Sequence, residues 1–128
     1  MKAHSTYSFA CAAFAALVAA SSLAGCFSDR GGITATDGEE LCTGTQPANV
    51  VRISDFQFSP AQVTVASGQE VVWVNCGPSQ HSSTSDADVW DSNVLPRFAV
   101  FRRTFTQAGS NPYHCEPHPS MRATVVVQ

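Results

Sequence analysis

Short stretches of alternating hydrophobic and polar residues recur along the chain from residue 50 onward. Residues 62–65 (QVTV) show the pattern plainly and are followed by the turn-forming pair Ser67-Gly68. A period of two residues is typical of β-strands, and no stretch shows the period of about 3.6 residues expected of an amphipathic helix. Strand-like stretches cover residues 50–53, 56–59, 62–65, 70–75, 98–105 and 122–128. Because turn signals separate them about every ten residues, the pattern predicts an all-β fold, an antiparallel β-sandwich or barrel.

The alternation also predicts which side chains form the core. Val63 and Val65 fall on one face of their stretch, and the polar residues between and before them fall on the other. Four large aromatic side chains are expected to be buried, each contributing about 2 kcal/mol. They are Trp73, Phe56, Phe58 and Phe105. Residues 109–112 (GSNP) are expected to interrupt the strands.

The N-terminal residues have a different pattern, typical of an export signal. Met1-Lys2 gives a positive start, and a small-residue apolar run from Phe9 to Leu23 is too short for a good membrane span. The run ends in LAGC, which resembles the lipobox of bacterial lipoproteins. We therefore predict a cleaved signal peptide over residues 1–25, with Cys26 lipidated as the new N-terminus. The alternative is an ordinary signal peptide with a chance cysteine.

Composition divides the remaining chain into two parts. Residues 26–48 contain few large apolar residues and are interpreted as a flexible tether, and residues 49–128 as one folded domain. The net charge of the 128-residue chain is −3, without a basic stripe, which argues against nucleic acid as a partner. We expect a monomer, exported and lipid-anchored on the periplasmic or cell-surface side of a bacterial membrane.

The cysteines outside the leader suggest one disulfide. Exported proteins meet an oxidising compartment, so Cys42 and Cys76 are predicted to pair. Two unpaired thiols are the alternative. A pair for thiol–disulfide exchange is disfavoured because the spacing is not C-x-x-C.

The segment YHCEPHPSM, residues 113–121, carries the most informative chemistry. It places a thiolate, an imidazole and a thioether three residues apart, at Cys115, His118 and Met121. Two histidines, one cysteine and a weak axial methionine are typical of blue-copper electron-transfer sites. His81, in a loop after residues 70–75, is the best candidate for the missing ligand. His114 is the rival, but neighbours in an extended strand point to opposite faces, so it should point away from the site.

This loop resembles the copper loop of the cupredoxins, most closely that of the amicyanins with their C-x2-H-x2-M spacing. The upstream FQFSPAQVTVASGQEVVWVN is also similar to the plastocyanin, pseudoazurin and amicyanin group. The resemblance covers residues 50–128 and implies an eight-stranded Greek-key sandwich. It implies one copper ion cycling between Cu(I) and Cu(II), outer-sphere electron transfer, and transient redox protein partners. The implied electron port is His118.

Two residues depart from the family pattern. Ser82 stands where these proteins usually have an asparagine that braces the cysteine loop, and Ser120 replaces a bulky residue near the usual docking surface. The first departure affects the hydrogen bonds around the metal ligands, and the second affects which redox partner can dock.

Other functions fit the sequence less well than electron transfer. A copper carrier or buffer without an electron-transfer role is the stronger alternative, and a zinc site or a copper-free sandwich is a weaker one. An enzyme is disfavoured, because catalytic copper centres on this type of fold need further histidines. Three aspartates, Asp86, Asp88 and Asp91, are interpreted as a solvated loop. A docking role for that loop, or for Arg97, Arg102 and Arg103, is the alternative.

Overall fold

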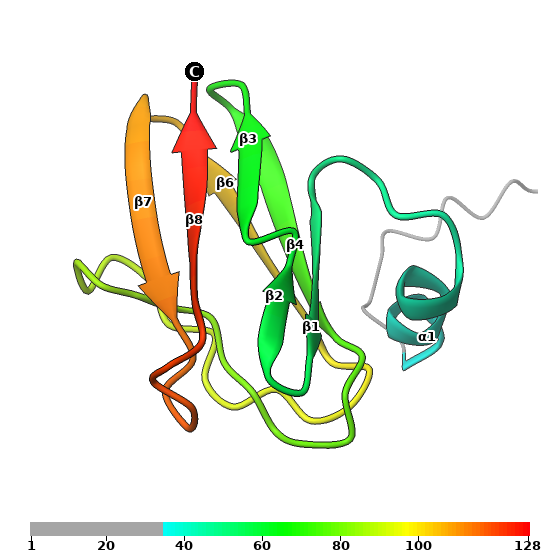
Figure 1. The fold of residues 1–128 in the computed structure, drawn as a ribbon. Helices are drawn as coiled ribbons and strands as arrows, with labels where there is room; N and C mark the ends of the chain where they lie inside the picture. The colour runs from blue at the N-terminus through cyan, green and yellow to red at the C-terminus, as the bar shows by residue number, and fades with distance from the viewer. Residues whose placement is uncertain (1–34) are drawn as a thin grey trace, which may run out of the picture.

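The computed structural model describes residues 35–128, which form two four-stranded sheets packed face to face (Figure 1). The first sheet has the order β2 (Gln57–Ser59), β1 (Val50–Ser54), β4 (Gln69–Asn75), β6 (Val100–Phe105). The second has the order β3 (Gln62–Val65), β8 (Arg122–Val127), β7 (Gly109–His114), β5 (Thr84–Ser85). The predicted all-β sandwich is therefore confirmed.

The sheets are mixed rather than purely antiparallel. Strands β1 and β4 run parallel, with Ile53 opposite Asn75, and β3 and β8 run parallel, with Val63 opposite Val125. The expectation of an antiparallel sandwich was wrong in this respect. Alternation determines which face of a strand is buried, but it carries no information about the direction of a partner distant in sequence.

The core between the sheets follows the predicted pattern, with one exception. Trp73, Phe58 and Phe105 are buried, as are Val63 and Val65 on the inner face of β3. Phe56 is 60% exposed, so its predicted place in the core was wrong. It lies in the turn between β1 and β2, where the alternation of the strands no longer applies.

The GSNP sequence forms the first part of β7 instead of a break. Its Pro112 pairs with Thr124 of β8 on one side. On the other side β5 reaches only Tyr113 and His114, so no strand there requires an N–H from residue 112. A proline is tolerated at such an edge position.

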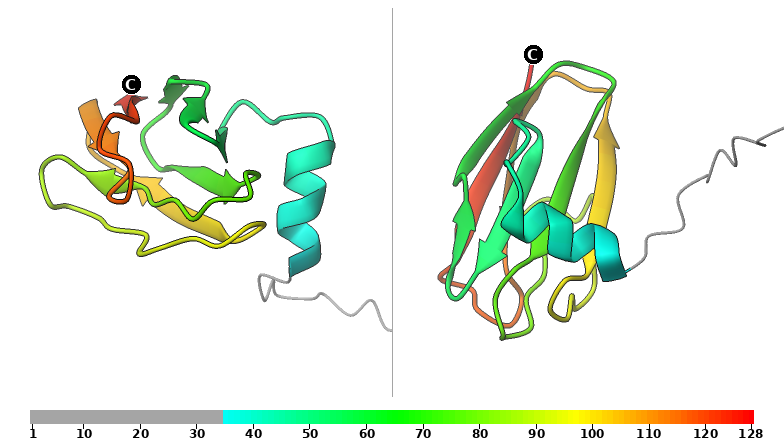
Figure 2. Two further views of the ribbon diagram at one scale, coloured as in Figure 1. Left: turned by 60° about the horizontal axis from the view of Figure 1, so that its bottom comes forward. Right: turned by 90° about the vertical axis from the view of Figure 1, so that its right-hand side faces the viewer.

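Helix α1 (Ala35–Thr43) lies inside the segment interpreted as a flexible tether. It packs on the outer face of the first sheet (Figure 2). There Leu41 and Cys42 contact a cluster formed by Val50, Val72 and Val74. Cys42 forms a disulfide with Cys76, the residue that follows β4. Residues 35–43 are thus helical and bound to the domain, which corrects the tether prediction for this part.

Two further contacts hold α1 in place. The Arg52 guanidinium donates a hydrogen bond to the carbonyl of Leu41, which has no partner in the last turn of the helix. It donates a second to the carbonyl of Gly44, the residue that follows the helix. A Cβ at Gly38 would lie 1.7 Å from the carbonyl oxygen of Phe98, so only glycine permits this close approach. Sequence patterning missed the helix because it buries few large apolar side chains.

The remaining N-terminal predictions lie outside the described residues. These are the signal peptide over 1–25, lipidation at Cys26, and the tether over 26–34. Between residues 35 and 128, no helix is long and apolar enough to cross a lipid bilayer.

Candidate metal centre

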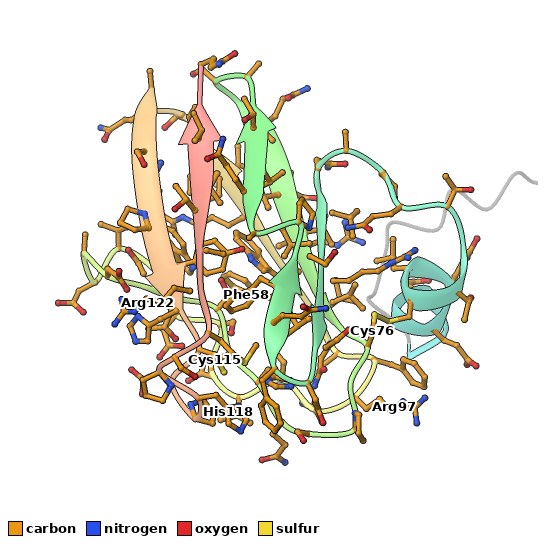
Figure 3. All side chains as sticks on the ribbon, in the orientation of Figure 1. Phe58, Cys76, Arg97, Cys115, His118 and Arg122 are labelled. Carbon is orange, nitrogen blue, oxygen red and sulfur yellow. A yellow bond between two sulfur atoms is a disulfide. The ribbon has the colours of Figure 1, made fainter. Side chains whose placement is uncertain are left out.

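Three of the predicted ligands converge at one end of the sandwich. Cys115 directly follows β7, and His118 lies in the loop between β7 and β8 (Figure 3). His81 lies in the loop after β4. The Cys115 Sγ is 3.7 Å from His81 Nδ1 and 3.6 Å from His118 Nδ1. The two Nδ1 atoms are 3.2 Å apart. These three atoms are close enough together for one metal ion to bind all of them.

The loop from Cys115 to Met121 is closed by its own backbone. The N–H of His118 donates to the carbonyl of Cys115, and the N–H of Met121 donates to the carbonyl of His118. The N–H of Cys115 in turn donates to the carbonyl of Met121 at 3.1 Å. Met121, the fourth predicted ligand, is buried in this loop. The loop is therefore fixed by hydrogen bonds that do not depend on a metal.

Ser82 links the two ligand-bearing loops. Its N–H donates to the Cys115 Sγ at 3.4 Å, and its Oγ accepts from the N–H of Glu116 at 2.8 Å. The Oγ of Ser82 is also 3.0 Å from that of Thr84, which donates to a carboxylate oxygen of Asp91. Because this carboxylate can only accept, the hydroxyl of Ser82 donates to Thr84 and its lone pair remains available to Glu116. Serine thus braces the cysteine loop despite its short reach.

His81 is fully buried, and Asp55 contacts its ring on the side away from Cys115 and His118. The Nε2 atom of His81 lies 2.8 Å from Asp55 Oδ1. Since a carboxylate accepts, Nε2 carries the proton, and the lone pair of Nδ1 is directed towards Cys115 and His118. The hydrogen bond with His81, aided by those from Ser79, lowers the pKa of Asp55 below its usual value.

Sequence reasoning missed Asp55. It lies 26 residues before His81, in the turn after β1, and an acidic residue in a turn is too common to be a signal.

Asn75 supports the loop that carries His81. Its side-chain amide donates to the carbonyls of Ser79 and Leu95 at 2.7 and 2.9 Å. Leu95 also forms a backbone bridge with His81, with hydrogen bonds in both directions. His81 is therefore held by its backbone as well as by its ring.

His118 lies nearer the surface than the other predicted ligands. It is partly exposed, whereas His81, Cys115 and Met121 are buried. The exposed ring of Phe56 packs edge-to-face against it, with ring centroids 4.8 Å apart. His118 and Phe56 thus form the part of the site nearest to solvent.

His114 faces away from the cluster, as predicted. Its Nδ1 lies 2.5 Å from Asp86 Oδ1, and the other oxygen of Asp86 accepts from Arg122 at 3.2 Å. The interpretation of the three aspartates as merely solvated was therefore incomplete, because Asp86 forms an ion pair and Asp91 binds the hydroxyl of Thr84.

The three arginines considered for docking also have partners. Arg102 pairs with Glu70, and Arg97 and Arg103 lie over the rings of Phe98 and Trp90.

Comparison with known proteins gives consistent matches in sequence. Residues 45–128 match the family described as copper binding proteins, plastocyanin/azurin family. The chain is 30% identical to amicyanin of Paracoccus versutus over 103 residues, 75% of this chain and 78% of that protein. It is also 30% identical to amicyanin of Paracoccus denitrificans over 119 residues, 89% of this chain and 91% of that protein.

Solved structures match as well. An amicyanin variant in its oxidised state is 31% identical, with a TM-score of 0.59, over 62% of this chain and 80% of that chain. A purple cupredoxin from Nitrosopumilus maritimus also has a TM-score of 0.59, over 62% of this chain and 98% of that chain. Its identity is 22%, so this second likeness supports the fold alone.

Proposed function

Because this chain belongs to the plastocyanin/azurin family of copper-binding proteins, we propose that it carries single electrons between redox proteins outside the cytoplasm. Its cofactor is one copper ion, and its family and its similarity to amicyanin make it a copper electron-transfer protein. The proposed ligands are His81, Cys115, His118 and Met121. Bound there, copper would supply a one-electron couple between Cu(I) and Cu(II).

The observation that carries the proposal is the clustering of two imidazole nitrogens and one cysteine sulfur within 3.2 to 3.7 Å of one another. This ligand set, with a methionine in the same loop, is that of blue-copper sites. The loop hydrogen bonds and the Ser82 bridge hold the ligands in position without help from a metal. Such a preset site needs little rearrangement when its charge changes by one.

The route for electrons in this proposal is through His118. The other three proposed ligands are buried, so the ring of His118 is the shortest path from the site to a docked partner. Phe56 extends the apolar surface beside that ring. A small apolar area suits weak, transient docking.

The proposed location rests on the Cys42–Cys76 disulfide, because disulfides persist mainly in oxidising compartments. We place the protein on the periplasmic or cell-surface side of a bacterial membrane, as a monomer anchored through lipidated Cys26. Growth with a labelled fatty acid would test the anchor. Incorporation that is lost in Cys26→Ala supports it, and incorporation that survives contradicts it.

The experiment that tests the function is spectroscopy of the purified protein after addition of Cu(II). An intense visible thiolate-to-copper band with narrow copper hyperfine splitting in the EPR spectrum is expected. Cys115→Ala and His81→Ala should abolish the band. His114→Ala is the matched control and should leave it intact, because His114 binds Asp86 instead.

A pale product with an ordinary copper EPR signal would contradict the proposal. Rapid loss of copper to a chelator would then favour a copper carrier or buffer. For electron transfer we expect slow loss, because His81, Cys115 and Met121 are buried.

A further inference from the structure

Both carboxylate oxygens of Asp55 form hydrogen bonds with the loop that carries His81. One oxygen accepts from His81 Nε2 at 2.8 Å, and the other accepts from the hydroxyl of Ser79 at 2.7 Å. The N–H of Ser79 adds a longer contact of 3.4 Å to the first oxygen. The Asp55 side chain is 24% exposed, and the residue as a whole lies at the surface of its turn. Both oxygens are thus engaged by the loop that carries His81.

Gly77 leaves the space that this carboxylate needs. A Cβ at Gly77 would lie 2.4 Å from Asp55 Oδ1, so any other residue would push the carboxylate away. The register of β1 and β4 places Ile53 opposite Asn75. The turn that carries Asp55 and the loop that carries His81 therefore lie at the same end of the two strands. The N–H groups of Cys76 and Gly77 both donate to the carbonyl of Ile53 and fix that approach.

We propose that Asp55 is a positioning residue of the copper site, which fixes the tautomer of His81 and lowers the reduction potential of the bound metal. The inference rests on the proposed function for its effect on potential. Its effect on the tautomer concerns the protein alone.

Asp55 acts on the site in two ways. A hydrogen bond from Nε2–H to a carboxylate keeps Nδ1 unprotonated, turns the ring, and makes the imidazole a stronger donor. The negative charge of Asp55 is also only one imidazole ring away from the metal position. Both effects favour the more highly charged Cu(II) over Cu(I). Removing them should therefore raise the potential.

The test uses the full chain, exported and loaded with copper, in four variants measured by redox titration of the visible band. Asp55→Ala should shift the Cu(II)/Cu(I) equilibrium about tenfold towards Cu(I), about 59 mV for one electron. Asp55→Asn, which keeps the shape and removes the charge, should shift it in the same direction. Gly77→Ala should do so too, because it displaces the carboxylate without removing it.

Asp86→Asn is the matched control. It also removes one negative charge from a histidine–aspartate pair, but its histidine is His114, which is outside the cluster. The shift in reduction potential that Asp86→Asn causes should be less than about a third of the shift that Asp55→Ala causes. An equal shift in Asp86→Asn and Asp55→Ala, with the blue band intact in both, would overturn the role in potential.

Nitrogen-15 NMR of the metal-free chain provides a second readout. The proton should be on Nε2 of His81 in the wild type, and Asp55→Ala should allow both tautomers. If the wild type gives no blue band, the proposed function fails, and this spectrum still decides the positioning role. An unchanged His81 tautomer in Asp55→Ala would refute that role.

Discussion

Removing the Cys42–Cys76 disulfide should weaken the fold without removing the metal site. The bond joins α1 to the end of β4 across 34 residues, and the double variant C42A/C76A keeps small apolar side chains against the outer face of the first sheet. Neither bonded cysteine belongs to the cluster of His81, Cys115 and His118. The variant therefore tests the cross-link and not the ligands.

The magnitude follows from loop closure. A bridge closing a loop of 34 residues lowers the entropy of the unfolded chain by about 13 cal/mol/K, which amounts to about 4 kcal/mol at room temperature. Domains of this size unfold with a free energy of about 5–15 kcal/mol, so C42A/C76A should still fold. With a guanidinium m-value of about 3 kcal/mol/M, the unfolding midpoint should fall by about 1.3 M.

The assay is equilibrium unfolding of the metal-free protein followed by tryptophan fluorescence, because a bound metal would add its own stabilisation. Leu41→Ala serves as the control, since it reduces the packing of α1 but keeps the bridge. Its effect should be clearly smaller. A loss below about 1 kcal/mol in C42A/C76A would refute the reasoning from chain entropy.

Two further predictions concern buried polar groups. Burial raises the pKa of Tyr113, so an unfolded chain loses this proton first, and the free energy of unfolding should fall as the pH rises above about 10. In an alkaline absorbance titration, with Tyr113→Phe as reference, Tyr113 should ionise only together with unfolding; ionisation near pH 10 in a folded protein contradicts this. Ser82→Ala removes the acceptor of the Glu116 N–H and should lower the stability of the metal-free protein by about 1–3 kcal/mol in urea unfolding. An unchanged midpoint would show that the brace is dispensable.

The clustering of the candidate ligands was largely predictable, because most of them lie close together in the sequence. Cys115, His118 and Met121 lie within seven residues of one loop, and their spacing alone suggests their grouping. The prediction of His81 as a ligand required only that its loop and the Cys115 loop lie at the same end of the sandwich. The distinction from His114 followed from the alternation of side chains along a strand.

The groups around the ligands were not predictable, because they depend on pairing between distant strands. Asp55 and Phe56 reach the histidines only because β1 runs parallel to β4 with Ile53 opposite Asn75. A hydrophobic pattern fixes neither that direction nor that register. Phe56 was assigned to the core because the strand alternation was extended into the turn between β1 and β2, whereas the residue packs against His118 at the surface.

The order of the strands in the two sheets has a consequence for when the ligand cluster forms during folding. The first sheet needs residues 50–105 and the second needs residues 62–127, so the two ranges interleave and neither sheet can form as an independent unit. Such non-local pairing is typical of domains that fold slowly, on the millisecond-to-second scale. His81 follows a strand of one sheet, whereas the Cys115 loop joins two strands of the other. The complete cluster of His81, Cys115 and His118 therefore exists only after both sheets have closed.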